Sequence, residues 1–209
     1  MGMTRAKKDA PRRSRRKEYA EATRQAIVDA ARKLFSERGY FLTKVDDIAA
    51  LARVAPATVY VVSGGKHGLL TTLVDFWSNA PIVETTLKRS NEMSESRALL
   101  RLAAATCCAM RKEYGDIIHL ILDTAPHDQE VARTLATATG IYRKALLRMG
   151  RRLVELGELR PDLDLAEASD VLWFYFGYHS LFTLVEDNGW SWDSAEAWLG
   201  DAAIQALLK

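Results

Sequence analysis

The sequence has no apolar stretch long enough to cross a membrane as a helix, which needs roughly 18 consecutive apolar residues. The segment that comes closest, residues 171–185, is interrupted by a glycine, a histidine and a serine. The N-terminus lacks the short apolar block that follows the basic region of a secretory signal. The two cysteines, Cys107 and Cys108, are adjacent and predict no disulfide framework. These absences favour a soluble chain in a reducing, cytoplasmic compartment, without a membrane partner.

Common catalytic motifs are absent as well. The segment Gly64-Gly65-Lys66 lacks the rest of a phosphate-binding loop, because Tyr60 stands where the first glycine belongs and His67 follows the lysine. The sequence contains no HExxH, GxSxG or GxGxxG pattern. We therefore expect no enzymatic activity, no catalytic residues and no cofactor.

One pair of residues has a spacing that also suits metal ligands. His119 and Asp123 lie four residues apart on one predicted helical face. A proline three residues later interrupts that helix, so ordinary hydrogen-bonded polar side chains are the favoured interpretation. Cys107 and Cys108 point about 100° apart on a helix, which suits small core residues better than a shared metal or a redox pair. No metal site is predicted.

Charge is distributed unevenly along the chain, although the net charge is only +2. Residues 1–66 contain 15 Lys and Arg against 7 Asp and Glu, a net charge of +8, whereas the remaining residues carry −6. A basic N-terminal third suits contact with a polyanion such as DNA. Residues 1–20 are especially basic and poor in large apolar side chains, so the composition predicts a disordered arm in isolation. A solvated tail without a role is the alternative.

Helical periodicity begins after residue 20. Apolar residues within 27–35 recur at the spacing of one helical face, and Gly39 is placed to end that helix. The pattern at residues 43–46, Thr-Lys-Val-Asp, is typical of a capping box and predicts the start of a second, short helix. Pro56, a residue suited to a first helical turn, predicts the start of a third. Two short helices joined by three or four residues outline a helix-turn-helix within a domain of residues 21–66.

The remaining sequence predicts further helices. A fourth helix follows Gly64-Gly65 and carries Leu69, Leu73 and Trp77. Later helices are expected near residues 95–114, 116–124, 128–156, 164–187 and 193–208. No alternating strand pattern or internal repeat is present. The expected fold class is all-α, with eight or nine helices, in which residues 67–209 form a ligand-binding and dimerisation domain.

An ordered set of residues within 27–70 carries a family resemblance. The set consists of Ala30, Ala31, Leu34, Phe35, Gly39, Tyr40, Thr43, Val45, Asp47, Ile48, Ala49, Val54, Ala57, Thr58, Val59, Tyr60, Lys66, Leu69 and Leu70. In this order the residues resemble the DNA-binding domain of TetR-family transcriptional regulators. Residues 157–164 are also similar to the link before that family's penultimate helix. The resemblance implies a repressor that binds a palindromic operator as a dimer and is released by a small-molecule effector.

Contacts to DNA are expected from eight residues: Thr43, Lys44, Arg53, Pro56, Ala57, Thr58, Tyr60 and Lys66. The three hydroxyl groups and the Lys66 ammonium suit backbone phosphates. Pro56 and Ala57 suit thymine methyl groups, whereas Lys44 and Arg53 suit guanine, with a solvated role as their alternative. The arginine-rich arm suits an A·T-rich minor groove.

Several residues depart from the family pattern. Arg53 stands where the family often has a turn glycine, and Ala55 replaces a serine whose side-chain cap contributes on the order of 1 kcal/mol. Ser63 replaces a common phenylalanine and His67 a common glutamate. These departures keep two alternatives open: an activator, and a helical ligand-binding protein with weakened or lost specific DNA binding.

Residues 172–182 are apolar on nearly every side, which predicts one face in the protomer core and another against a partner. The resemblance implies that this helix and the last one form a homodimer interface. Candidates for an effector pocket are Trp77, Met110, Tyr114, His119, Trp173, Tyr178 and His179. Core packing is the alternative for each of them. Large aromatic side chains with few fixed charges favour a neutral or cationic effector of aromatic or apolar character.

Overall fold

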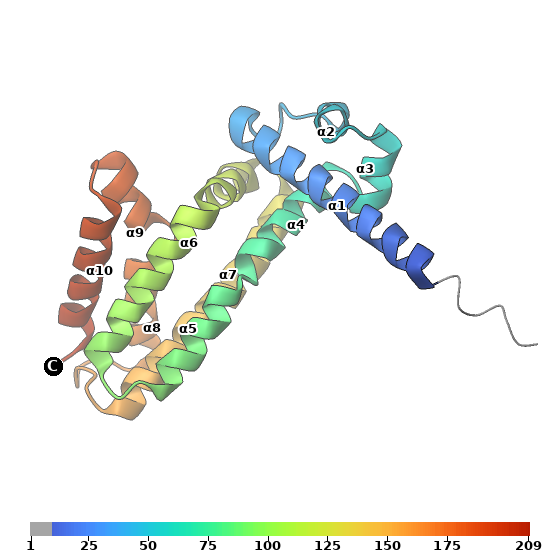
Figure 1. The fold of residues 1–209 in the computed structure, drawn as a ribbon. Helices are drawn as coiled ribbons and strands as arrows, with labels where there is room; N and C mark the ends of the chain where they lie inside the picture. Colours follow the sequence, from blue (N-terminus) through green and yellow to red (C-terminus); the bar gives the residue numbers. More distant parts are fainter. Residues whose placement is uncertain (1–9) are drawn as a thin grey trace, which may run out of the picture. The chain divides into compact units, whose positions relative to one another are not determined.

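The computed structural model describes residues 10–209, which are almost entirely helical (Figure 1). The helices are α1 (Ala10–Arg38), α2 (Val45–Ala52), α3 (Pro56–Ser63), α4 (Lys66–Ser78), α5 (Pro81–Glu92), α6 (Ser96–Thr124), α7 (Gln129–Leu156), α8 (Leu165–Phe176), α9 (His179–Phe182) and α10 (Trp192–Leu207). A 3₁₀ turn, η1 (Ala125–His127), and a π-helical turn, η2 (Thr183–Asp187), complete them. The predicted all-α fold class is confirmed. Among these residues no helix is long and apolar enough to cross a membrane.

The chain divides into two compact units between Leu73 and Val74, inside α4. In the first unit, α2 packs against both α1 and α3. Its core contains side chains that are fully or almost fully buried: Ile27, Phe35, Ile48, Val59, Leu69, Leu70 and Leu73. Because the last three belong to α4, the compact unit extends beyond residue 66, the boundary that the sequence predicts.

Helix α1 begins at Ala10 and therefore includes half of the segment that the composition predicts to be disordered. Residues 1–9 of that arm lie outside the described residues. Residues 10–20 are rich in Ala, Arg, Lys and Glu, which have high helix propensity. Once a later part of a helix is fixed by packing, each residue added to its N-terminal end forms one more backbone hydrogen bond. The first turns of α1 can therefore be helical without burying apolar side chains.

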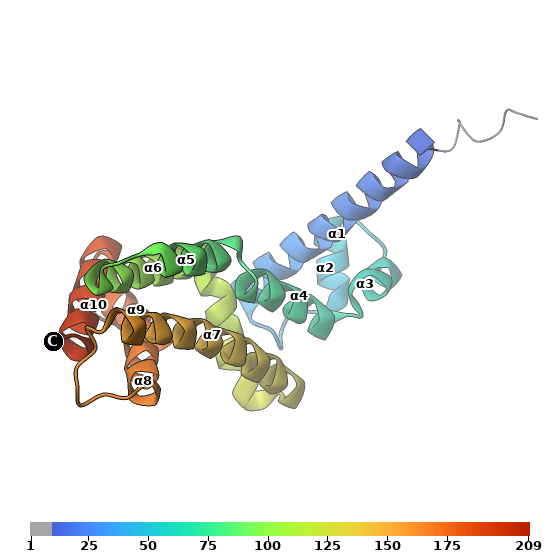
Figure 2. The ribbon, with the colours of Figure 1, turned by 90° about the horizontal axis from the view of Figure 1, so that it is seen from below.

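The second unit is a helical bundle (Figures 1 and 2). Helix α6 packs against α10 and α7, and α7 also packs against α8 and α5. The core between them includes Leu99, Leu100, Leu153, Leu172 and Leu199. This bundle carries both the cavity and the apolar surface described below.

Two helix boundaries and one whole helix differ from the sequence prediction. Helix α6 continues through Gly115, where a Cβ would make an ordinary contact with the Phe182 ring at 3.5 Å. The predicted helix 164–187 breaks at Gly177, which has extended backbone and where a Cβ would lie 2.3 Å from the Trp173 carbonyl oxygen. Helix α5 is not among the predicted helices, although Pro81 at its first turn is a start signal.

Candidate nucleic-acid interface and effector cavity

The turn between α2 and α3 is closed by Arg53 in a left-handed conformation. Its φ is 57° and its ψ is 44°, and its N–H donates to the Ala50 carbonyl at 3.2 Å. The next residue, Val54, donates to the Ala49 carbonyl at 3.0 Å. These two bonds satisfy the end of α2 and turn the chain toward α3. The Arg53 side chain is exposed, so its positive charge lies on the surface of the turn.

Helix α3 has one buried face and one outward face. Val59 is fully buried in the core of the unit, whereas Pro56, Ala57, Tyr60 and Val61 are exposed, Val61 by 86%. These four positions, spaced i, i+1, i+4 and i+5, form a continuous outward surface. The helix starts at Ala55 without a side-chain cap and has no acidic residue in its first turn. An uncapped, uncharged N-terminus suits the approach of a phosphate.

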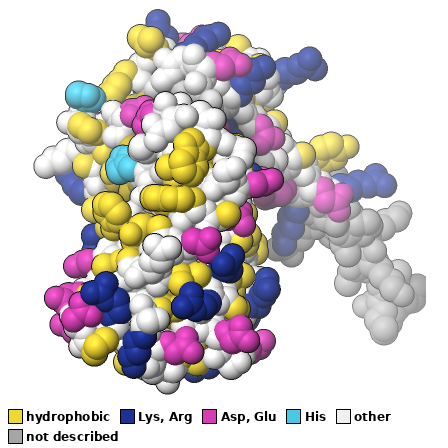
Figure 3. All heavy atoms as spheres, turned by 90° about the vertical axis from the view of Figure 1, so that its left-hand side faces the viewer, with side chains coloured by type: hydrophobic (Ala, Val, Ile, Leu, Met, Phe, Trp, Pro, Cys, Tyr) yellow, Lys and Arg dark blue, Asp and Glu magenta, His cyan; other side chains and the backbone are white. Residues whose placement is uncertain are grey.

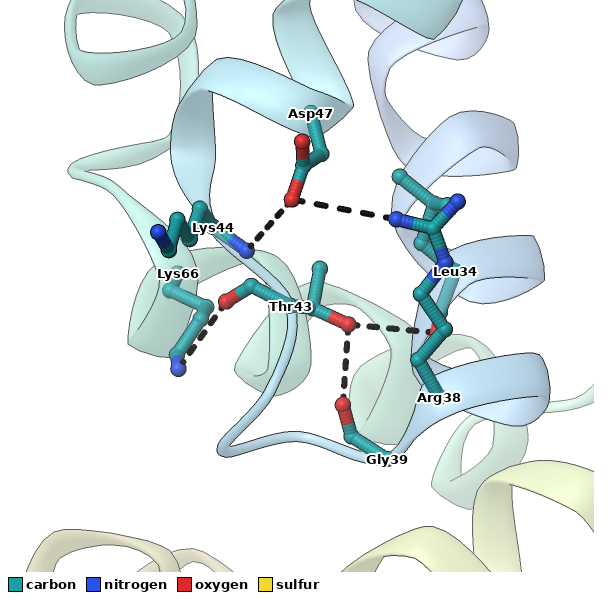
Figure 4. Close-up of polar contacts among 7 residues, drawn as sticks. All are labelled: Leu34, Arg38, Gly39, Thr43, Lys44, Asp47 and Lys66. Atoms are coloured by element: carbon teal, nitrogen blue, oxygen red, sulfur yellow. Dashed lines mark hydrogen bonds and ion pairs between the residues drawn. The ribbon is translucent and has the colours of Figure 1, made fainter.

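Thr43 and Lys66 point inward instead of toward the solvent (Figure 4). The Thr43 hydroxyl is directed at the Gly39 carbonyl, 2.8 Å away, and the Leu34 carbonyl, 3.1 Å away, and the residue is 1% exposed. The Lys66 ammonium donates to the Tyr40 carbonyl at 2.7 Å and the Thr43 carbonyl at 3.2 Å. It also lies 4.3 Å from the centroid of the Tyr40 ring. Both side chains therefore brace the loop before α2, and the phosphate contacts expected of them stay a prediction.

The N-terminus of α2 is also shifted from its predicted position. Lys44, not Thr43, is the N-cap residue, and its N–H donates to the Asp47 carboxylate at 3.3 Å (Figure 4). Arg38 lies 3.9 Å from the same carboxylate. Because Asp46 and Asp47 occupy the first turn, negative charge already fills the positive end of this helix. An incoming phosphate is thus better placed at α3 than at α2.

The predicted DNA contacts therefore fall into two groups. Lys44, Arg53, Pro56, Ala57 and Tyr60 are exposed on the first unit, and Thr58 is half-buried on α3. Thr43 and Lys66 have inward-facing polar groups. The predicted contacts do not include Val61. It lies two residues after the buried Val59, and residues two apart on a helix point to nearly opposite faces, so Val61 is exposed.

A cavity of about 70 Å³ lies in the second unit. Helices α4 to α7 contribute its walls, which are mostly apolar. The lining includes Trp77, Leu87, Met110, Arg111, Ile141, Tyr142, Leu146 and Met149. Trp77 and Met110 are thus the two predicted pocket residues found there.

The other five predicted pocket residues lie elsewhere. His119 stacks on Phe182, and its ring nitrogen lies 3.0 Å from the Glu186 carboxylate. The ring centroid of Trp173 lies 4.6 Å from the Arg143 guanidinium. The Tyr178 hydroxyl pairs with the Thr139 hydroxyl at 2.9 Å. Tyr114 is half-buried and His179 is exposed, and neither lines the cavity. Tyr178 still contributes indirectly, because its ring packs against Trp77 with centroids 5.6 Å apart.

Arg111 is the residue that the sequence prediction missed. It is 2% exposed, and one terminal nitrogen donates to the Gly177 carbonyl at 2.7 Å. Its Nε and its other terminal nitrogen are buried and have no hydrogen-bond acceptor among residues 10–209. The rings of Tyr142, Tyr178 and Phe182 surround the guanidinium at 5.6 to 5.9 Å.

The break in the helix at Gly177 explains part of this arrangement. The break leaves carbonyl groups at the end of α8 that need donors. The Tyr142 hydroxyl donates to the Phe176 carbonyl, and Arg111 donates to the Gly177 carbonyl. Burial raises the pKa of the Tyr142 phenol, so this hydroxyl remains a protonated donor at neutral pH.

The neighbouring cysteines belong to the core, as expected from their spacing. Cys107 and Cys108 are both buried and unpaired, on α6. Burial, with a hydrogen bond to Glu196, raises the pKa of Cys108 to about 11. A thiol with such a pKa is protonated at neutral pH and therefore a poor nucleophile.

An apolar surface covers parts of α8 and α10. Phe174 is 71% exposed and Trp198 is 49% exposed, and Trp190 packs edge-on against Trp198 with ring centroids 5.9 Å apart. Figure 3 views the side on which α10 lies and shows apolar side chains gathered there. Exposed aromatic side chains grouped in this way are typical of a surface that contacts another protein.

Comparisons with known proteins find relatives over most of the chain. Residues 27–72 match the model for bacterial regulatory proteins of the tetR family. The chain is 27% identical over 176 residues to an uncharacterized HTH-type transcriptional regulator, YdeS, of Bacillus subtilis (strain 168), covering 80% of this chain and 83% of that protein. It shares its fold with the transcriptional regulator FadR from Bacillus subtilis in complex with stearoyl-CoA (TM-score 0.72, 18% identity, 86% of this chain and 97% of that one). A SmeT–triclosan complex also has this fold (TM-score 0.71, 20% identity, 90% of this chain and 92% of that one).

Proposed function

Because the chain belongs to the TetR family of bacterial regulatory proteins, we propose that this transcriptional regulator is a dimeric repressor released from its operator by a small molecule. The observation that carries the proposal is the outward face of α3, held by the buried Val59 and flanked by the exposed Arg53 and Lys44. A short helix that presents one face in this way is suited to the major groove of DNA.

Specific roles follow from the chemistry of that face. Pro56, Ala57 and Val61 provide apolar contacts to thymine methyl groups, because they carry no side-chain hydrogen-bond donor. The Tyr60 hydroxyl, with Thr58 beside it, suits backbone phosphates. Arg53 and Lys44 are the side chains able to donate to guanine or to phosphate, and the basic residues that precede α1 add sequence-independent attraction.

The dimer is proposed to form through α8 and α10. Their exposed aromatic side chains, Phe174 on α8 and Trp198 on α10, are unusually large for a solvated surface, and Trp190, which precedes α10, packs against Trp198. A two-fold axis at this surface would present two copies of α3, and a palindromic operator with half-sites roughly 34 Å apart suits such a pair.

The effector role is supported by the cavity between α4 and α7. Its walls are mostly apolar, as in small-molecule sites generally. The FadR and SmeT structures that share this fold each contain a ligand with a large apolar part, stearoyl-CoA and triclosan. A compound that fills the cavity and lowers the affinity for DNA would act as the inducer.

Selection of genomic DNA fragments by the purified protein tests the DNA-binding part. Recovery of one palindromic motif is the expected result, and fragments without a shared motif would refute specific regulation. The release experiment then separates a repressor from an activator on the same domain. An inducer should dissociate the repressor from this motif, whereas an activator would stay bound.

The dimer surface is tested by Trp198→Glu, which places a charge in the proposed interface. Analytical ultracentrifugation should show a dimer for the unmodified protein and a monomer for this variant, with weaker operator binding. Ile82→Glu is the matched control, because Ile82 is also an exposed apolar residue but lies on α5. A dimer that persists in Trp198→Glu would place the interface elsewhere.

A further inference from the structure

We infer that the effector cavity is built for an amphipathic carboxylate, a compound with one anionic head group and an apolar body, with Arg111 as the residue that binds the head group. The inference rests on the proposed effector role of the cavity and adds the charge of the ligand. It differs from the neutral or cationic effector that the aromatic residues of the sequence suggest.

The first argument concerns the charge of Arg111. A guanidinium remains protonated in proteins, and a buried charge is strongly unfavourable unless it is paired and hydrogen-bonded. Arg111 is 2% exposed, and no carboxylate among the described residues forms an ion pair with it. The side chains around it are those of Cys107, Tyr142, Tyr178 and Phe182. The protein therefore buries a positive charge without supplying its counter-ion.

The second argument concerns hydrogen-bond donors. One terminal nitrogen of Arg111 is used by the Gly177 carbonyl, which accounts for a structural role at the helix break. Nε and the other terminal nitrogen have no acceptor within the described chain. A structural role alone does not explain these additional N–H donors. A neutral side chain with one donor could serve the Gly177 carbonyl without leaving further buried donors unsatisfied. Cδ lies between Nη1 and the Nε–H, so a carboxylate would accept one charge-assisted hydrogen bond from one of these two nitrogens.

The third argument concerns position. Arg111 lines the cavity together with Cys107 and Tyr142, and it is the only charged side chain among the described residues of that lining. The remaining walls are mostly apolar, including Leu87, Ile141, Leu146 and Met149, so they suit a hydrocarbon or aromatic body. Thr86 and Thr106 also line the cavity, and their hydroxyls pair with each other at 2.8 Å. A cationic compound would meet the unpaired guanidinium and be repelled.

The experiment compares acids with their uncharged amides on the full-length protein. Octanoate and octanamide form one pair, and 2-naphthoate and 2-naphthamide form the other, which separates aliphatic from aromatic bodies. Isothermal titration calorimetry should show that at least one acid binds roughly 30-fold or more tightly than its amide, the factor expected for one buried charged pair. Equal affinity of acid and amide in both pairs, or no binding of either acid, would overturn the inference.

The variant Arg111→Met removes the charge but keeps a long side chain. It should reduce acid binding to the level of the amide, roughly 30-fold or more, while amide binding stays unchanged. Because an unpaired buried charge is replaced by an apolar group, the ligand-free variant should melt at the same temperature or higher. Acid binding that survives in Arg111→Met would also overturn the inference. Arg143→Met is the control, since it removes an exposed arginine outside the cavity lining.

Operator release, measured with the same acids, distinguishes the two proposals. Acids that bind through Arg111 but do not release DNA support the carboxylate site and refute the inducer role. Release by neutral compounds while neither acid binds supports the inducer role and refutes the carboxylate site.

Discussion

Replacement of Arg53 with glycine is expected to stabilise the DNA-binding unit and to weaken its binding to DNA. Among residues 10–209, Arg53 is the only non-glycine residue with positive φ, 57°. A side chain in this region costs roughly 1–2 kcal/mol. Glycine removes that cost but adds about 0.4–1 kcal/mol of conformational entropy to the unfolded chain. Because the Arg53 side chain is exposed, its removal loses no packing in the core. The expected net gain is about 1 kcal/mol, or a melting temperature roughly 4–8 °C higher for a unit of this size.

The same substitution removes one positive charge from each protomer. Each phosphate contact contributes about 0.9 to the slope of log K against log salt concentration, so a dimer would lose up to about 1.8. Thermal unfolding and fluorescence anisotropy over a range of salt concentrations measure the two effects on one preparation. Arg53→Ala is the matched control, because it removes the charge but keeps a Cβ in the left-handed conformation.

The two variants separate strain from charge. Both should bind DNA more weakly, but only the glycine variant should melt at a higher temperature. A glycine variant that melts below the unmodified protein would show that the left-handed Arg53 carries no strain to relieve. A glycine variant with unchanged affinity and unchanged salt dependence would remove Arg53 from the DNA interface.

Four further substitutions test local features of the structure. Ala55→Ser should raise the free energy of unfolding, measured with urea, by about 1 kcal/mol by capping α3, and no gain would contradict the uncapped start. Gly68→Ala should lower it by more than about 2 kcal/mol, because a Cβ there would lie 1.7 Å from the Ser63 carbonyl oxygen, whereas Gly140→Ala, with open space around it, should be neutral or stabilising. The Cys108 pKa, raised by burial from 9.0 to about 11, favours the folded state below about pH 9, and this contribution is lost toward pH 11. Between those pH values the free energy of unfolding of the unmodified protein should fall by up to about 3 kcal/mol more than that of Cys108→Ala. An identical pH dependence of the two free energies of unfolding would refute the raised pKa.

The features that the sequence predicts well depend on local patterns. Gly39 is in the left-handed region with φ 79°, as its position after an apolar helical stripe predicts. Pro56 starts α3, as its suitability for a first helical turn predicts. Periodicity and helix-end signals act within a few residues of each other, so a single segment contains the information that they need.

The features that the sequence does not predict depend on distant partners. The Thr43 hydroxyl contacts the Leu34 carbonyl nine residues away, and Lys66 contacts carbonyls 23 and 26 residues away. Gly115 and Gly177 are the same residue type in similar apolar helices, yet only Gly177 breaks its helix. The difference is tertiary: the carbonyl groups freed at Gly177 find donors on α6 and α7, which no local pattern specifies.

Arg111 combines a local signal with a tertiary one. Its position on α6 is three and four residues after Cys108 and Cys107 and seven before Ile118, so it falls on the apolar stripe of the helix. Periodicity alone therefore places a charged residue in the core, although the polar residues that follow it in sequence suggest a solvated face. Only the structure reveals that its surroundings provide the Gly177 carbonyl and the nearby Tyr142 hydroxyl, but no described carboxylate for the charge. If the chain itself supplied the counter-ion, Arg111 would be a structural ion pair and the cavity would be neutral. Because it does not, the electrostatic cost of burying this side chain is offset best by an anion that enters from outside, and the charge of the effector follows from the cavity.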